Sequence, residues 1–280
     1  MLRQRVLTAV LLLLVLVPAM MYPKPQAFMA LTLLMIAAGG WEWGRLNGAG
    51  STAVAWGAGC ALLCGTTWAL GWVEQDLGLL WQLVAAFWVL LGALLLACGS
   101  SVWNQWPRAI RLSLGLAVLA LAWLALIQAR LLGLNFLLSA LVLVWVADIG
   151  AYFVGRAWGR RKLAPGISPG KSWEGVWGGL ASVVLLATAW LWADQYWTMD
   201  SPSLFTRLWA MSPLLLATGL AYLVTMAVVG DLVESLVKRA AGVKDSSGLL
   251  PGHGGILDRV DALLPTIPAA MMLASFGMPV

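Results

Sequence analysis

Charged side chains are scarce in this sequence of 280 residues, because Asp, Glu, Lys and Arg together make up only 10% of it. Soluble proteins carry about 25% of such residues. The shortage, together with a mean hydropathy of +0.88, excludes an ordinary soluble domain. No internal repeat and no low-complexity segment is visible beyond a bias toward leucine and alanine.

Histidine and cysteine, which serve many covalent and metal-dependent mechanisms, are nearly absent. The chain has one histidine, His253, and three cysteines, an odd number that cannot pair completely. Cys60 and Cys64 lie one helical turn apart inside an apolar run, so buried thiols are favoured over a disulfide or a metal site. No Ser-His-Asp or Cys-His nucleophile is visible, and chemistry of that kind has no support in the sequence.

Long apolar runs, by contrast, recur along almost the whole chain. A helix needs roughly 20 mostly apolar residues to cross a bilayer, so these runs predict an all-α, polytopic integral membrane protein. We predict about nine spans, near residues 5–22, 26–44, 52–73, 79–98, 109–130, 133–155, 173–194, 208–232 and 261–279. Many of the 18 tryptophans fall near span ends, among them Trp43 and Trp103, which predicts anchoring at the membrane surface.

The basic residues predict how these spans are oriented. Lysine and arginine stay on the cytoplasmic side of short loops. With a cytoplasmic N-terminus, fourteen of the seventeen lie in inside segments, and only Lys24, Arg130 and Arg207 lie outside. The long polar gaps, about 156–172 and 233–260, then both face the cytoplasm. The net charge of +5 reflects this bias and suits an anionic lipid headgroup, and we expect no nucleic-acid partner.

The C-terminal gap concentrates acids, a hydroxyl and glycines. On a helix, Asp231 and Ser235 are one turn apart, and Lys238 follows on the same stripe. Asp258 and Asp261 are neighbours if the last helix begins near 257. Clustered carboxylates need a counter-charge, and Mg²⁺ supplies one with carboxylate and phosphate oxygens as ligands. Pairing of each aspartate with a nearby Lys or Arg is the simpler alternative, and three acids beside a glycine loop favour the metal.

The earlier gap reads DIGAYFVGRAWGRRKLAPGISPGKSWEG. It resembles a P-loop only in part, because Pro165 stands where that motif needs glycine. The basic cluster is equally well explained as an ordinary cytoplasmic loop, whereas Lys171, next to Pro169 and Gly170, is favoured as a phosphate ligand. Asp148 lies inside the sixth predicted span, where an acid is costly and therefore a functional candidate.

An ordered pattern follows the eighth span: Ser235-x-Val237-Lys238-Arg239, then Lys244-Asp245, then His253-Gly254-Gly255-x-x-Asp258-Arg259-Val260-Asp261. Over these 27 residues the chain resembles the full signature of the phosphatidate cytidylyltransferases, also called CDP-diacylglycerol synthases. The segments DIGAYFVGR and ISPGKSWEG resemble the middle region of that family. Residues 1 to about 140 match only as a multi-span profile and show no chemistry of their own.

The resemblance implies an enzyme of the bacterial cytoplasmic (inner) membrane that condenses CTP with phosphatidic acid to CDP-diacylglycerol and pyrophosphate. It implies Mg²⁺ as cofactor, with a second metal or a monovalent cation left open, membrane lipids as partners, a homodimer and an active site facing the cytoplasm. We predict as catalytic residues Asp231, Asp258, Asp261, Lys238 and Arg259. The predicted substrate-binding residues are Lys171, Ser168, Lys244, Asp245, His253, Gly254, Gly255 and Arg239. The predicted metal ligands are Asp231, Asp258, Asp261, Ser235 and Asp148.

These predictions divide the chain by role. Residues 1–132 are expected to form a helical scaffold that faces lipid and serves for dimerisation, and residues 133–280 are expected to carry the catalytic region. Two other functions stay open: a CTP-dependent kinase of a polyprenol or other lipid alcohol, and a cation transporter that uses Asp148. A CDP-alcohol phosphotransferase is excluded because Asp258 and Asp261 have the wrong spacing for its motif.

Overall fold

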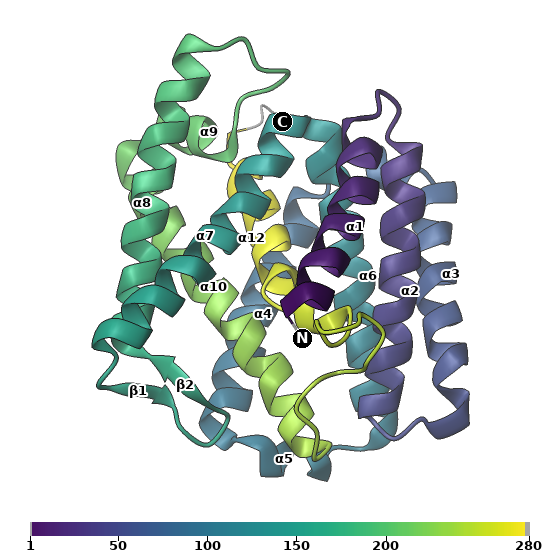
Figure 1. The fold of residues 1–280 in the computed structure, drawn as a ribbon. Helices are drawn as coiled ribbons and strands as arrows, with labels where there is room; N and C mark the ends of the chain where they lie inside the picture. Colours follow the sequence, from purple (N-terminus) through teal and green to yellow (C-terminus); the bar gives the residue numbers. More distant parts are fainter. Residues whose placement is uncertain (1, 278–280) are drawn as a thin grey trace.

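The structure is a computed structural model that describes residues 2–277, and helices dominate it (Figure 1). The principal helices are α1 (Leu2–Met21), α2 (Gln26–Leu46), α3 (Ala53–Ala69), α4 (Gly78–Cys98), α6 (Arg108–Leu132), α7 (Leu134–Trp158), α8 (Trp173–Tyr196), α10 (Pro213–Ala240) and α12 (Leu263–Ser275). The shorter helical elements are η1 (Gly50–Thr52), η2 (Trp72–Glu74), α5 (Ser100–Gln105), α9 (Leu204–Met211) and α11 (Leu257–Val260). Each predicted span overlaps one of the principal helices. The span predicted at 208–232 also takes in the end of α9, and residues 278–279 of the last predicted span lie outside the described residues.

Six of these helices, namely α2, α4, α6, α7, α8 and α10, are long and apolar enough to cross a membrane. Among residues 2–277, the helices at the other three predicted spans are shorter in their apolar part. Helix α3 has 17 residues and α12 has 13, while the apolar stretch of α1 covers Val10–Met21. The structure therefore supports a helical integral membrane protein, and the number of nine spans stays a prediction.

A short β hairpin lies between α7 and α8, where the sequence predicted only an irregular basic loop. Strands β1 (Lys162–Ala164) and β2 (Ser168–Ser172) pair antiparallel, with Lys162 opposite Ser172. Pro165 and Gly166 occupy the turn between them, a position that suits residues with a fixed or permissive backbone. Because β2 leads directly into α8, Lys171 is held on a strand next to the start of a helix.

Helix α10 begins at a proline and extends further than predicted. Ser212 caps it by accepting a hydrogen bond from the backbone N–H of Leu214 at 3.2 Å, and Pro213 fits the first turn because a proline there loses no helical hydrogen bond. The helix continues to Ala240, well past the predicted end near residue 232. Residues 232–238 are all buried, so packing within the protein sustains its last turns.

Small residues allow two helix pairs to approach closely, α2 with α3 and α7 with α8. A Cβ atom on Gly57 would lie 2.6 Å from the carbonyl oxygen of Ala37, and one on Gly179 would lie 2.8 Å from that of Ala147. Helix α12 packs against α4, α6 and α10. The C-terminal helix thereby joins the first and second halves of the chain around one apolar core.

The prediction that Trp43 and Trp103 anchor the protein at the membrane surface is wrong. Both are buried, with exposed fractions of 8% and 1%, and their rings meet edge to face at 5.8 Å. Each indole N–H donates a hydrogen bond at 2.9 Å, from Trp43 to the Arg111 carbonyl oxygen and from Trp103 to Asn47 Oδ1. A buried indole needs such an acceptor, and the neighbouring helices supply it.

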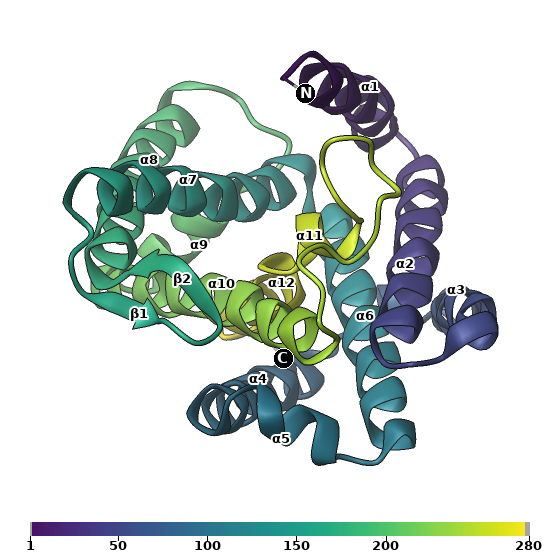
Figure 2. The same cartoon turned by 60° about the horizontal axis from the view of Figure 1, so that its bottom comes forward.

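The elements that carry polar residues collect at one end of the molecule. The β hairpin, α5 and the loop that precedes α11 lie at this end, and α9 lies at the opposite end (Figure 1). Seen from the polar end, the loop before α11 passes beside α1 and α2 (Figure 2). The two polar gaps in the sequence therefore meet on one face, as the charge distribution predicted.

Candidate functional site

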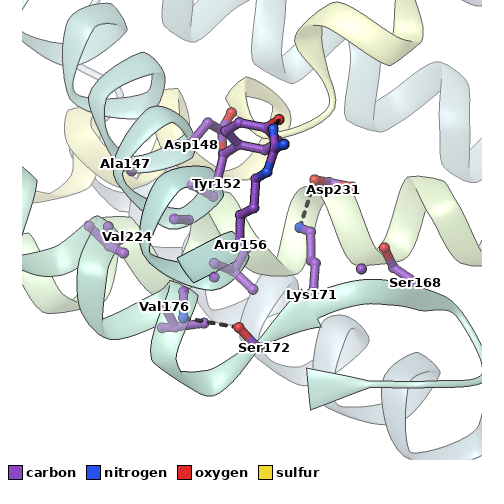
Figure 3. Close-up of a pocket in the computed structure, with 17 residues that line it drawn as sticks. Ala147, Asp148, Tyr152, Arg156, Ser168, Lys171, Ser172, Val176, Val224 and Asp231 are labelled. Carbon is purple, nitrogen blue, oxygen red and sulfur yellow. Dashed lines mark hydrogen bonds and ion pairs between the residues drawn. The ribbon is translucent and has the colours of Figure 1, made fainter. Parts of the chain in front are cut away.

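A cavity of about 410 Å³ lies between α7, the β hairpin, α8 and α10. Asp148 of α7, Lys171 of β2 and Asp231 of α10 all line it (Figure 3). The other polar side chains in its lining are Tyr152, Arg156, Ser168 and Ser172. The remaining wall consists of Gly, Ala and Val. The structure thus brings Asp148 and Lys171 to Asp231, as the sequence predicted from residues far apart in the chain.

Lys171 and Asp231 form an ion pair across the cavity, with 2.6 Å between Nζ and Oδ2 and side chains that are 24% and 31% exposed. The neighbouring Ser172 fixes the end of β2, because its hydroxyl accepts a hydrogen bond from the N–H of Gly175 at 3.2 Å and caps α8. A partly exposed ion pair of this kind contributes little to stability. The ion pair instead places one basic and one acidic group side by side in the lining of the cavity.

Asp148 belongs to a polar stripe on one face of α7. Tyr152 and Arg156 follow at intervals of four residues, which places all three on the same side of the helix, and all three line the cavity. Arg156 donates a hydrogen bond to the Tyr152 hydroxyl at 2.9 Å. Sequence reasoning counted Arg156 only among the basic loop residues and missed Tyr152, although the four-residue spacing from Asp148 was available as a signal.

The cavity fits Mg²⁺ only together with a phosphorylated ligand. Within residues 2–277, no three His, Cys, Asp or Glu side chains converge to form a metal site by themselves. Two carboxylates, those of Asp148 and Asp231, nevertheless line the same cavity. Mg²⁺ is usually held by one or two carboxylates plus substrate phosphates and water. The donor set therefore suits a metal that arrives with a nucleotide or a phospholipid.

Asp258 lies outside this cavity lining and is surrounded by hydrogen-bond donors. Its Oδ1 accepts from Lys238 Nζ at 2.6 Å, and its Oδ2 accepts from the N–H groups of Ser246 and Gly255 and from the Ser246 hydroxyl. Burial alone would raise the pKa of Asp258, but the hydrogen bonds from Lys238, Gly255 and Ser246 lower this pKa to about 2. Asp258 is ionised and serves here to close the loop before it. Its contacts are those of the simpler alternative to a metal site that the sequence left open, an aspartate paired with a lysine.

Glu234, which the sequence analysis did not select, lies in the same cluster. It is 3% exposed and forms an ion pair with Lys238, one turn further along α10. Lys238 thus contacts Glu234 and Asp258, while Asp231 on the same helix pairs with Lys171 instead. The predicted stripe on α10 is therefore divided between two neighbouring charge clusters.

Ser235 and Asp261 lie next to Asp231, as the sequence predicted. The Ser235 hydroxyl donates to Asp231 Oδ1 at 3.2 Å. Asp261 Oδ1 accepts from the N–H of Ala262, and the Asp261 backbone approaches α10 where a Cβ atom on Gly230 would lie 2.4 Å from its carbonyl oxygen. Only glycine at position 230 permits this contact, which holds the start of α12 beside Asp231.

The remaining predicted residues occupy the loop between α10 and α11 or border it. Arg259 donates from Nε to the His253 carbonyl oxygen at 3.0 Å. Arg239 donates to the carbonyl oxygens of Ile167 and Val243 and so links the β hairpin to this loop. Lys244 and Asp245 are exposed at the polar end. None of the five side chains lines the cavity.

The two glycines after His253 serve the packing of the loop. Gly254 has a φ of 82°, which favours glycine. A Cβ atom on Gly255 would lie 2.0 Å from Ser246 Oγ and 2.3 Å from Glu42 Oε1. The N–H of Gly255 donates to Asp258, so the prediction of glycine N–H groups open to an anion does not describe position 255.

Glu42 of α2 is the polar residue of the first half that the sequence analysis overlooked. Its side chain is fully buried and accepts hydrogen bonds from the N–H groups of Ile256 and Leu257 at 2.9 and 2.8 Å. The hydroxyl of Ser247 also donates to it, and the Ser246 hydroxyl, which donates to Asp258, lies 3.2 Å from Glu42 Oε2. An acid in the last turns of an apolar helix was a signal in its own right, because such a group needs partners when it is buried.

Taken together, the apolar helices and the cavity with its lysine and two carboxylates define a helical membrane protein with a charged cavity at its polar end. The sequence profile of the cytidylyltransferase family matches residues 3–276. A match over nearly the whole length means that the chain belongs to this family.

Individual relatives agree with that membership. A phosphatidate cytidylyltransferase of Pseudomonas aeruginosa is 41% identical over 286 aligned residues, which cover 100% of both chains. The phosphatidate cytidylyltransferase of Haemophilus influenzae is 50% identical over 136 residues, or 49% of this chain and 44% of that protein. The one of Bacillus subtilis is 44% identical over 136 residues, or 49% of this chain and 46% of that protein.

Proposed function

We propose that this protein transfers the cytidylyl group of CTP to phosphatidate and releases pyrophosphate. The observation that carries the proposal is the joint placement of Asp148, Lys171 and Asp231 on one cavity at the polar end of a membrane protein. The full-length similarity to a phosphatidate cytidylyltransferase supplies the substrate class. Both substrates are polyanions, so the main barrier is charge repulsion. The lysine reduces this repulsion directly, and the two carboxylates would reduce it by holding a metal ion.

In the proposed reaction, a phosphate oxygen of phosphatidate forms a new bond to the α-phosphorus of CTP. The bond from that phosphorus to the oxygen of the β-phosphate breaks, and pyrophosphate leaves with the electron pair. Lys171 binds a phosphate and orients it. Because phosphoryl transfer depends mainly on positioning and electrostatics, no covalent enzyme intermediate is needed. Asp148 and Asp231 would hold Mg²⁺, which neutralises phosphate charge when bound. Ser235 orients Asp231 through its hydrogen bond.

Asp258 and Lys238 contribute little charge of their own to substrate binding, because they neutralise each other. Lys238 lies between Glu234 and Asp258, so its charge is already offset by two carboxylates. We propose that these residues, with Asp261, hold α11 and α12 against α10 and keep Asp231 in place. Residues 133–280 then carry the chemistry, and residues 1–132 provide the helical scaffold, with the exception argued for Glu42 below.

The direct test is an assay with the purified full-length protein. We expect radiolabelled cytidine from CTP to appear in a lipid when phosphatidate and Mg²⁺ are present, with one pyrophosphate released per lipid formed. Labelled γ-phosphate in the lipid would instead identify a kinase of a lipid alcohol. Ion flux into vesicles without CTP turnover would identify a transporter. Either result contradicts the proposal.

We further propose that the protein lies in the inner membrane as a homodimer with its N-terminus and its cavity on the cytoplasmic side. The support for the orientation is the excess of basic residues in the predicted inside segments, and the homodimer follows from the family resemblance alone. In a variant without Cys98, the exposed cysteine, Arg160→Cys should react with a membrane-impermeant thiol reagent only from the cytoplasm. Thr198→Cys should react only from outside. Reversed labelling would refute the orientation, and a monomeric mass in native mass spectrometry would refute the dimer.

A further inference from the structure

The loop that carries the His-Gly-Gly sequence is held at both ends by two carboxyl groups from different parts of the chain. Asp258 binds the N–H groups of Ser246 and Gly255. Glu42 binds the N–H groups of Ile256 and Leu257 and the hydroxyl of Ser247. Asp258 lies next to the loop in sequence, whereas Glu42 lies more than 200 residues before it.

One side chain joins the two carboxyl groups. The Ser246 hydroxyl lies 3.2 Å from Glu42 Oε2 and 2.9 Å from Asp258 Oδ2. Gly255 packs against both Ser246 and Glu42 so closely that a Cβ atom would overlap them. Loop, α2 and α11 therefore form one continuous hydrogen-bonded unit.

This unit connects to the cavity through Lys238. Asp258 accepts from Lys238 at 2.6 Å, and Lys238 lies on α10, the helix that also carries Asp231. A second connection runs through Arg239, which binds the Ile167 carbonyl oxygen in the hairpin that carries Lys171. Contacts of α10 thus run both to the unit, through Lys238, and to the hairpin, through Arg239.

We propose that Glu42 is a positioning residue for the cytidylyl transfer: it fixes the loop of residues 246–257 on α2, so that Asp258 and Lys238 hold α10 and its Asp231 in the reactive arrangement. This inference rests on the proposed function. Burying a carboxyl group costs free energy unless donors surround it. Three partners of Glu42 are clear donors, the N–H groups of Ile256 and Leu257 and the hydroxyl of Ser247, and they come from this one loop and the α11 start that follows it.

The test compares Glu42→Gln with a matched variant, Asn47→Ala. Gln keeps the shape of Glu42 but turns one acceptor oxygen into an NH₂ group that faces donors. Asn47 is also buried, directly after the last residue of α2, and its side chain binds Trp103 and the end of α2, away from the loop. We expect Glu42→Gln to lower kcat roughly 10–100-fold, the usual loss when a residue behind the reacting groups is changed. Asn47→Ala should leave kcat of the folded enzyme near the wild-type value.

Hydrogen–deuterium exchange supplies a readout that needs no activity. In Glu42→Gln, amide exchange should accelerate in the peptide that covers residues 246–257, while peptides of α6 and α8 keep wild-type exchange. Ser247→Ala removes one donor to Glu42 and provides a milder variant if Glu42→Gln does not fold. The effects of Ser247→Ala and Glu42→Gln on kcat should not multiply in the double variant, because both remove the same contact.

The outcomes separate this inference from the proposed function. A wild-type enzyme that forms no CDP-diacylglycerol refutes the proposed function, and the exchange experiment then still tests whether Glu42 holds the loop. An active wild type together with normal kcat or unchanged loop exchange in Glu42→Gln refutes the positioning role. An equal loss of kcat in Asn47→Ala also refutes it, because the effect would then follow from general loosening of α2.

Discussion

The two halves of this protein use the same packing but contain very different polar chemistry. Residues 2–132 and residues 133–277 each contain a helix pair joined through glycines, α2 with α3 and α7 with α8. The first half holds only three of the twelve acids, Glu42, Glu74 and Asp76. The cavity with Asp148, Lys171 and Asp231 lies entirely in the second half. Close helix packing is therefore a general feature of the fold, and the site depends on which helix faces carry charge.

Most buried polar groups in the first half form hydrogen bonds with partners in the same half. Four buried tryptophans donate to acceptors on neighbouring segments: Trp43 to Arg111, Trp81 to Gln128, Trp103 to Asn47 and Trp123 to Thr32. Such neutral hydrogen bonds stabilise the packing and leave no charge to bind a substrate. Glu42 is the exception, because its partners lie in the second half.

The largest expected effect tests whether charge in the second half is essential. Asp231→Asn keeps the shape of the side chain but removes the charge that pairs with Lys171. We expect kcat to fall by about 10²–10³ or more, as when one electrostatic group of an active site is lost, with normal folding in detergent. Glu74→Gln, an exposed acid of the first half, is the control. Near-normal turnover of Asp231→Asn contradicts the proposed site.

A smaller effect on substrate binding is expected from the lysine of the hairpin. Lys171→Ala should raise the KM for CTP by a factor corresponding to about 1–3 kcal/mol, the range for a lost charge-assisted hydrogen bond. Lys162→Ala changes a lysine on the paired strand that is exposed and lies outside the cavity lining, and its KM should stay at the wild-type value. Equal shifts in the two variants would indicate a general effect of basic charge at the hairpin.

The glycine contacts provide a direct comparison of the two halves. Gly57→Ala and Gly179→Ala each place a Cβ atom within 2.6–2.8 Å of a carbonyl oxygen on the paired helix. Both should lower the free energy of unfolding by about 1–3 kcal/mol, the usual cost of an overfilled contact. Only Gly179→Ala should also lower kcat, because Gly179 lines the cavity. Thermal unfolding in detergent and turnover of the folded fraction measure the two effects separately.

The smallest expected effect lies at the opposite end of the second half. Asp194 of α8 accepts hydrogen bonds from Asn135, Ser203 and Thr206, far in sequence from the cavity residues on its own helix. Asp194→Asn should lower the free energy of unfolding by about 1 kcal/mol and leave kcat and the KM for CTP unchanged. A changed KM would mean that the whole second half, rather than its polar end, determines CTP binding.

The sequence by itself determined that this is a helical membrane protein, because apolar runs of bilayer length admit few other structures. It also predicted that Asp148 and Lys171 lie near Asp231, and all three line one cavity. The polar gaps meet on one face, as the distribution of basic residues predicted. These features follow from local composition and spacing.

Only the tertiary structure decided which donor each acid receives. Asp231 pairs with Lys171 rather than with Lys238 of its own helix, and Asp258 takes Lys238. The partners of Glu42 and the burial of Trp43 could not be read from the sequence, since each depends on contacts between segments that are distant in the chain. A helix shows its own period of 3.6 residues in the sequence. The neighbour that covers each of its faces is fixed only when the helices pack.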